Sequence, residues 1–117
     1  MVLDVIVIGA SQAGLAMGYF LKQKELSFAI IGRESRLGDI WRNRYDSLEL
    51  FTPRWLSALP GIGLSGDPMG YAGKDEISDY LEQYAKKFYL PVLLQVDVHR
   101  LEKGEAYLQS LPVRANT

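Results

Sequence analysis

An almost continuous apolar run opens the chain. Val2 to Ile8 is apolar and mostly β-branched apart from Asp4, a pattern typical of a strand buried on both faces of a parallel sheet. After a short glycine-containing segment, apolar residues recur at helical spacing and predict a helix whose apolar side holds Leu15, Ala16, Tyr19 and Phe20. Leu26 to Ile31 predicts a second buried strand, so the start of the chain predicts a β-α-β unit of about 30 residues.

The rest of the chain divides into a long irregular stretch and a second region of regular structure. Residues 32–73 hold most of the Gly and Pro, and such stretches are uncommon unless they serve a site or carry short elements of their own. Residues 74–88 predict a helix whose shared apolar face is Ile77, Tyr80, Leu81, Tyr84, Ala85 and Phe88. Pro91 to Val98 predicts a third strand, and residues 101–117 predict one or two short strands.

The composition indicates a soluble, globular protein. The 117 residues are 48% hydrophobic and 23% charged, which suits one domain or part of a larger one. A net charge of −1 gives no electrostatic footprint for nucleic acid or a membrane surface, so we expect neither partner. The first apolar run is too short to span a membrane and follows no basic segment, so we expect a cytoplasmic location.

Two side chains common in reactive sites are scarce. Cysteine is absent, which excludes a disulfide framework, a thiolate metal site and a redox dithiol. The single histidine, His99, argues against a histidine-rich metal site and against a Ser-His-Asp triad. We therefore expect no metal site, and we expect His99 to be an ordinary strand residue.

A glycine loop lies between the first predicted strand and the first predicted helix. In Gly9-x-Ser11-x-x-Gly14, Gly9 permits a tight turn and Gly14 permits close packing of helix on strand. The N–H groups at the start of the helix are then free to bind an anion. Ser11 replaces the usual second glycine and adds a Cβ that crowds a phosphate, although its hydroxyl can donate a hydrogen bond. The context favours a dinucleotide site over a strand-turn-helix that binds no ligand.

The end of the second strand departs from the dinucleotide pattern. An acidic residue is expected there, about 20 residues after the loop begins, to accept hydrogen bonds from ribose hydroxyls, but this position is Gly32. Glu34 is the nearest carboxylate, and Arg33 between them could stack on adenine, meet a phosphate or be a solvated loop residue. Loss of one charge-assisted hydrogen bond, about 1.5–3 kcal/mol, predicts roughly tenfold to hundredfold weaker adenosine binding.

The stretch that follows carries a family resemblance. Gly-Asp-Ile-Trp-Arg at residues 38–42 and Leu-Glu-Leu-Phe-Thr-Pro at residues 48–53 resemble the N-terminal part of flavin-containing monooxygenase-like FAD oxidoreductases, which include Baeyer–Villiger-type enzymes. The resemblance runs from about Val2 to Lys103. It implies an α/β fold: a Rossmann-like FAD/NAD(P)-binding unit of three layers with a mostly parallel sheet of three or more strands, forming one partial domain over residues 1–117.

The resemblance also implies roles for individual residues. Around the phosphates and ribose it implies contacts from Gly9, Ser11, Gly14, the N–H groups of Gln12 and Ala13, and the segment Gly32, Arg33 and Glu34, where Gly32 replaces the family's ribose-binding Glu. Trp41 and Arg42 are implied beside the flavin-ribityl part, Thr52 near the isoalloxazine edge, and the backbone of Val98 at adenine. Ordinary roles stay open: Trp41 in the core, Arg42 as surface charge and Thr52 in a turn. No catalytic side chain is expected, because such proteins chiefly bind and orient the cofactor.

Proteins of this group are several times longer and carry a second glycine-rich loop for NADPH, whereas this sequence has a single loop. We therefore expect an incomplete unit, which is an excised fragment, a truncated gene product or a reduced standalone protein. In the 3-2-1-4 strand order of this fold, the first strand then lies at the sheet edge. Exposed apolar edges tend to associate, so we expect a homodimer or coverage by the tail.

Two functions are expected, the first of them implied by the resemblance. The first is the FAD-binding portion of an NADPH-dependent flavin monooxygenase-like oxidoreductase that does not turn over alone. The alternative is a non-catalytic nucleotide-binding or assembly module, or a degenerate fragment, that has lost tight FAD binding; Ser11 and Gly32 favour it. The dithiol chemistry of flavin disulfide reductases is excluded, since cysteine is absent.

Overall fold

A small parallel sheet forms the centre of the protein. The computed structural model describes residues 3–102 and 105–110. Its three-stranded sheet has the order β1-β2-β5 and consists of β1 (Val5–Ile8), β2 (Phe28–Ile31) and β5 (Val92–Leu93). Both pairings are parallel, with Val5 opposite Phe28 and Ile30 opposite Val92. The predicted β-α-β unit is confirmed, and the third strand joins β2 so that β1 lies at the edge.

The prediction of one strand from Pro91 to Val98 is wrong. β5 ends at Leu93, and Gln95 takes a left-handed φ of 58° that turns the chain out of the sheet. β6 (Val96–Glu102) then pairs with the antiparallel strand β7 (Glu105–Ser110) in a separate hairpin. Apolar content alone does not reveal this break, because the residues on both sides of Gln95 suit a strand equally well.

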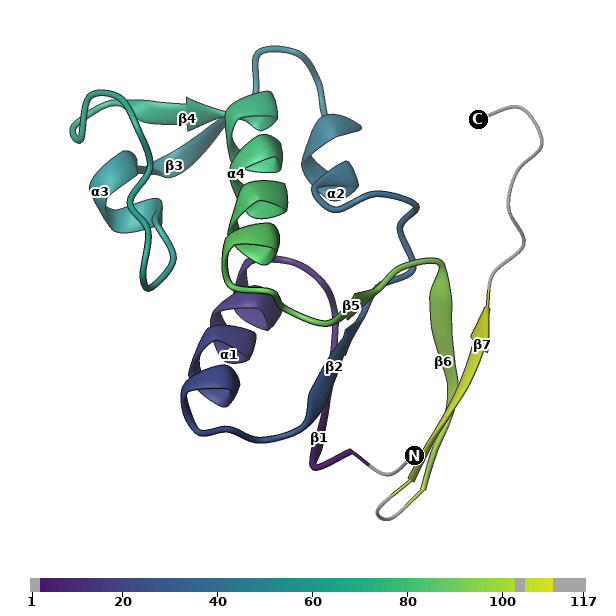
Figure 1. Ribbon diagram of the computed structural model, residues 1–117. Helices are drawn as coiled ribbons and strands as arrows, with labels where there is room; N and C mark the ends of the chain where they lie inside the picture. The colour runs from purple at the N-terminus through teal and green to yellow at the C-terminus, as the bar shows by residue number, and fades with distance from the viewer. Residues whose placement is uncertain (1–2, 103–104, 111–117) are drawn as a thin grey trace.

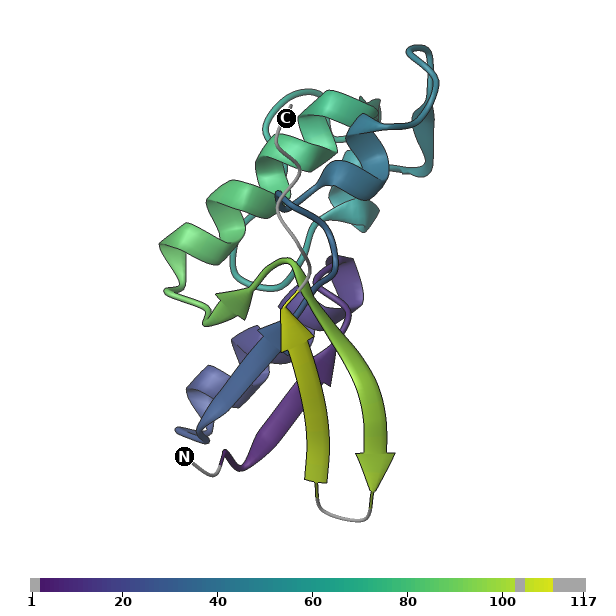
Figure 2. The ribbon, with the colours of Figure 1, turned by 90° about the vertical axis from the view of Figure 1, so that its right-hand side faces the viewer.

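The elements are stacked in three layers. The helices α1 (Gln12–Gln23) and α4 (Lys74–Lys87) pack together on one face of the parallel sheet. The β6–β7 hairpin lies on the opposite face, in front of β1 and β2 when the molecule is turned as in Figure 2. This arrangement, also seen edge-on in Figure 1, confirms the expected three-layer α/β fold.

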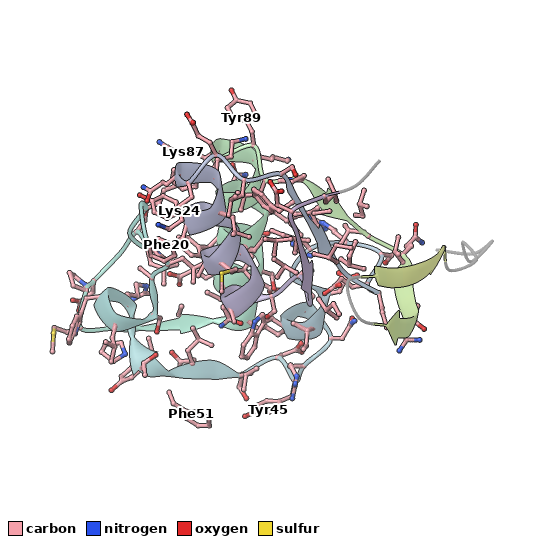
Figure 3. The ribbon with its side chains drawn as sticks, turned by 90° about the horizontal axis from the view of Figure 1, so that it is seen from below. Phe20, Lys24, Tyr45, Phe51, Lys87 and Tyr89 are labelled. Carbon is pink, nitrogen blue, oxygen red and sulfur yellow. The ribbon has the colours of Figure 1, made fainter. Side chains whose placement is uncertain are left out.

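Glycines decide which face of α1 meets the sheet. The buried residues of α1 are Gly14, Leu15, Gly18 and Leu21, whereas Phe20, expected on the apolar side, is 49% exposed. A Cβ built at Gly18 would lie 2.8 Å from Cδ1 of Ile30, so the absent side chain lets helix and sheet approach closely. The close approach turns the glycine-bearing face inward and leaves Phe20 at the surface (Figure 3).

The helix α4 supplies a large part of the core. Ile77, Leu81 and Tyr84 are fully buried, as the helical spacing predicts. The Tyr84 hydroxyl donates to the carbonyl oxygen of Pro60, and burial raises the pKa of Tyr84 to about 12. This face of α4 therefore holds both the sheet layer and part of the preceding loop in place.

The long stretch before α4 carries four short elements. These are α2 (Asp39–Arg42), β3 (Glu49–Pro53), α3 (Arg54–Ser57) and β4 (Tyr71–Gly73), with β3 and β4 paired antiparallel. The elements β3, α3 and β4 form a lobe. Arg54 joins this lobe to α4, because its Nε and Nη2 donate to the two carboxylate oxygens of Glu76 at 2.6 and 2.7 Å. Tyr45, which precedes β3, and Phe51 of β3 project outward (Figure 3), and Phe51 is 97% exposed.

Two carboxylates on α4 are expected to make the protein sensitive to acid. Hydrogen bonds from Arg54 and Arg36 lower the pKa of Glu76 and of Glu82, respectively, below the ordinary carboxyl value of 4.5. A carboxyl with a lowered pKa in the folded state stabilises the protein above its unfolded-state pKa, and this contribution is lost as pH falls through the folded-state pKa.

We therefore expect the free energy of unfolding to decline as pH falls below 4.5. Urea denaturation across acidic pH measures the decline, and the Glu76→Gln/Glu82→Gln variant should show a shallower one. Asp75→Asn, an exposed change on the same helix, serves as the control. Equal slopes for the double variant and the unaltered protein would contradict this expectation.

Candidate functional site

The glycine loop joins β1 to α1 in the geometry expected of a phosphate-binding turn. Gly9 has a φ of +110°, a conformation that favours glycine. A Cβ built at Gly14 would lie 1.9 Å from the carbonyl oxygen of Gly9, so only glycine permits this contact between loop and helix. The tight turn expected at Gly9 and the close packing expected at Gly14 are both present, and α1 begins directly beyond the carboxyl end of β1.

Ser11 and Gln12 link the loop to α2. The Ser11 hydroxyl donates to Oε1 of Gln12 at 2.9 Å, and Nε1 of Trp41 donates to the same oxygen at 3.2 Å. Ser11 is the N-cap residue of α1 but makes no side-chain capping bond within the described structure. The first N–H groups of α1, including those of Gln12 and the exposed Ala13, therefore lack a side-chain cap and suit an anion.

A cavity of about 540 Å³ opens beside this loop. Its walls come from the carboxyl ends of β1 and β2, the loop, α2 and the start of β6. In open α/β sheets, ligands bind at the carboxyl ends of the strands. The lining residues are Ile8, Gly9, Ala10, Ser11, Ile31, Gly32, Arg33, Glu34, Asp39, Ile40, Asn43, Val96 and Asp97.

At the end of β2, the cavity is lined by Gly32, the residue that replaces the expected acidic residue. Gly32 is buried, and a Cβ built on it would lie 2.1 Å from Oε1 of Glu34. The side chain of Arg33 instead forms an exposed ion pair, with Nε 3.3 Å from Oδ1 of Asp97. The Glu34 carboxylate thus occupies the space where a side chain at position 32 would begin.

The Gly-Asp-Ile-Trp-Arg stretch forms a docking element for α4. Gly38 has a φ of +92°, and a Cβ there would lie 2.8 Å from Cβ of Ser78. The Ser78 hydroxyl donates to the carbonyl oxygen of Gly38 at 3.0 Å, while Nη2 of Arg42 donates to Oε1 of Glu82 at 2.8 Å. These contacts fix α2 against α4 and place Asp39 and Asn43 at the cavity.

The structure does not bring every predicted site residue to the cavity. The side chain of Arg42 is directed to α4, and that of Trp41 reaches Gln12, so neither is among the lining residues. Thr52 is exposed on β3 and shares a hydrogen bond with the Ser57 hydroxyl. Val98 pairs with Leu108 in the hairpin. Their roles toward flavin and adenine remain predictions.

Sequence reasoning missed several lining residues. Asp39 and Asn43 lie one helical turn apart and reach the cavity together, so their spacing was a usable signal. Val96 and Asp97 reach it only because the chain turns at Gln95. That turn had no clear signal in the sequence.

Over residues 3–102 and 105–110, no helix is long and apolar enough to cross a membrane. Among those same residues, no three His, Cys, Asp or Glu side chains gather in a geometry that could hold a metal ion.

Comparison with known proteins settles the family. Residues 6–110 match the family described as pyridine nucleotide-disulphide oxidoreductase. The chain belongs to this oxidoreductase family. These 117 residues contain no cysteine, so they hold no redox dithiol.

The relatives within this family include bacterial oxidoreductases. The chain is 67% identical over 104 residues to "Uncharacterized oxidoreductase CzcO-like" of Geobacillus kaustophilus and 46% identical to "Uncharacterized oxidoreductase CzcO" of Bacillus subtilis. Each match covers 89% of this chain and 30% of the relative. The chain thus spans about a third of the length of the curated relatives it matches.

Solved structures show the same architecture. "Flavin-containing monooxygenase from Stenotrophomonas maltophilia" has a TM-score of 0.80 and 39% sequence identity to the chain. The match covers 87% of this chain and 31% of that protein. The flavin monooxygenase-like resemblance drawn from residues 38–53 is therefore confirmed at the level of family and fold.

Proposed function

We propose that the chain binds FAD, with the dinucleotide in the cavity between the glycine loop and the end of β2. The observation that carries this proposal is the contact between Gly14 and Gly9, where a Cβ would lie 1.9 Å from a carbonyl oxygen. The cavity is lined along the loop as far as Ser11, and the uncapped N–H groups of Gln12 and Ala13 follow directly in the chain at the start of α1. A pyrophosphate at this helix N-terminus satisfies those groups and meets the positive end of the helix dipole.

The remaining lining residues suit a nucleotide. Ile8, Ile31 and Val96 give the cavity apolar walls, while Glu34, Asp39 and Asn43 supply acceptors and donors for hydroxyl and amide groups. The loop and the ends of β1 and β2 are held by backbone hydrogen bonds, including that from the Gly9 N–H to the Ile31 carbonyl at 2.8 Å. The chain therefore offers a preformed site.

The same proposal assigns this chain the FAD-binding part of an NADPH-dependent, flavin monooxygenase-like oxidoreductase. The similarity to a flavin-containing monooxygenase supports the assignment. Bound FAD supplies the redox chemistry, and the residues of this chain bind and orient it. The sequence contains one phosphate loop, so we expect NADPH to find no second site here and the chain not to turn over alone.

We expect the purified chain to bind FAD in an equilibrium titration, because the loop and cavity are preformed. The visible spectrum of the FAD-loaded protein is then followed without oxygen after addition of NADPH. Bound flavin whose absorption persists with NADPH supports an FAD-binding part that needs a separate NADPH site. Rapid bleaching would contradict the absence of turnover, and failure to bind FAD would contradict the proposal itself.

The alternative is a non-catalytic nucleotide-binding or assembly module. Ser11 favours it, because its Cβ stands where dinucleotide loops usually have none. The exposed Phe51 and Trp55 also favour an assembly role. This alternative predicts binding of adenine nucleotides without a preference for FAD, and parallel titrations with FAD and ADP distinguish it.

We also propose that two chains associate through β1. Within the described residues β1 pairs only with β2, and Ile8 at its end is 55% exposed. Apolar edges of this kind are natural templates for pairing. We expect light scattering to give the mass of a dimer and hydrogen exchange to show protected β1 amides. A monomer with freely exchanging β1 amides would contradict the proposal; residues 111–117, the other expected cover, lie outside the described structure.

A further inference from the structure

We infer that Glu34 supplies the carboxylate that binds the ribose hydroxyls of the adenosine half, from a position two residues beyond the usual one. This inference rests on the proposed nucleotide function of the cavity. It concerns a departure of this chain from the dinucleotide pattern, because the position expected to carry the acid is Gly32.

The geometry places the Glu34 carboxylate beside Gly32, where a side chain at position 32 would begin. Its Oε1 lies 2.1 Å from the Cβ that Gly32 lacks, closer than two non-bonded atoms can approach. A larger residue at position 32 would therefore displace this carboxylate. The absence of a side chain at Gly32 and the placement of Glu34 are two parts of one arrangement, in which the acid reaches back over the end of β2.

The backbone around Glu34 holds this arrangement. The Gly32 carbonyl accepts from the Val96 N–H at 3.0 Å, and the Glu34 carbonyl accepts from the Gln95 N–H at 3.1 Å. Both bonds tie the segment after β2 to the turn at Gln95. The loop is thus anchored on both sides of Arg33, which orients the intervening side chains.

The charges nearby leave the Glu34 carboxylate available. Arg33, the closest cation in the sequence, is paired with Asp97 at 3.3 Å. In the described part of the chain, Glu34 has no salt bridge or side-chain hydrogen bond. The carboxylate lines the cavity and is half-buried, so it is free to accept hydrogen bonds from a diol.

The chemistry selects a nucleotide with an unmodified ribose. A carboxylate accepts from both hydroxyls of a cis-diol, and charge-assisted bonds of this kind are among the stronger hydrogen bonds in proteins. The same carboxylate repels a phosphate on the 2′ oxygen. Glu34 therefore favours FAD or ADP over 2′-phosphorylated nucleotides.

The test compares ADP with 2′,3′-dideoxy-ADP, which lacks both ribose hydroxyls, by calorimetric titration of the full chain. We expect the unaltered protein to bind ADP roughly tenfold to hundredfold more tightly. Glu34→Ala should remove this preference, and Glu34→Gln should retain part of it. Glu25→Gln makes the same chemical change at an exposed position after α1 and should leave the preference unaltered. Thermal melts confirm that each variant folds.

The outcomes separate this inference from the proposed function. If FAD binds but the preference for ADP is absent, or persists in Glu34→Ala, the role of Glu34 is wrong while the FAD site stands. If neither FAD nor ADP binds to the unaltered protein, both are wrong. Loss of the preference in Glu34→Ala with FAD binding weakened by a similar factor supports both.

Discussion

Gly14→Ala is expected to weaken FAD binding by on the order of a hundredfold. The new Cβ would lie 1.9 Å from the Gly9 carbonyl oxygen, so either the loop or the first turn of α1 must move. The N–H groups of that turn then retreat from the pyrophosphate. Hydrogen bonds to charged groups contribute about 1.5–3 kcal/mol each, so losing one or two gives an effect of this size.

The measurement is a fluorescence titration with FAD, and the control is Gly63→Ala. A Cβ at Gly63 meets nothing within 4 Å, so this variant should bind as the unaltered protein does. Overpacking also costs about 1–3 kcal/mol of stability, and a urea titration shows whether Gly14→Ala remains folded at the assay temperature. Unchanged FAD affinity in folded Gly14→Ala would exclude the loop as the pyrophosphate site.

Leu81→Ala is expected to lower the free energy of unfolding by about 2–5 kcal/mol. Leu81 is fully buried in α4, within the cluster that includes Ile77, Leu15 and Ile30. Truncation removes buried apolar surface and leaves a cavity that packed neighbours fill only in part. Small domains have a total stability of about 5–15 kcal/mol, so the loss is a large fraction of the whole.

Urea denaturation of Leu81→Ala and Leu56→Ala gives the comparison. Leu56 is 56% exposed on α3, and surface substitutions usually change stability by less than about 0.5 kcal/mol. Equal losses for the two variants would contradict the assignment of the core to the inner face of α4.

The exposed apolar residues distribute unevenly over the fold. Phe51, Trp55 and Leu56 all lie on the lobe formed by β3, α3 and β4 and are more than half exposed. The parallel sheet, by contrast, has β2 buried along its whole length. The Arg54–Glu76 pair holds the lobe to α4.

Periodicity predicted the elements whose burial is uniform. β2 is buried at every position, and the inner face of α4 follows the helical repeat, so apolar spacing was sufficient for both. It failed for Phe20, because the close contact of Gly18 with Ile30 decides the orientation of α1. A hydrophobic pattern depends on side chains, so it gives no signal for a glycine such as Gly18 that lets a helix approach a sheet.

The site was predictable in part for a similar reason. Gly9 and Gly14 carry a local signal, since Gly9 takes a positive φ in the turn and a Cβ at Gly14 would collide with the Gly9 carbonyl oxygen. Arg42 is held by Glu82, and the contributions of Asp39 and Val96 to the cavity depend on packing between distant segments. The position of the Glu34 carboxylate likewise depends on how the chain turns after β2, which sequence spacing alone does not give.

The central claim is that this chain holds FAD at the glycine loop, and a fluorescence titration of the purified protein with FAD tests it most directly. We predict saturable binding in the micromolar range that competes with ADP and is weakened on the order of a hundredfold in Gly14→Ala. The absence of binding at millimolar FAD would contradict the claim, and family membership would then describe the ancestry of the chain and not its ligand.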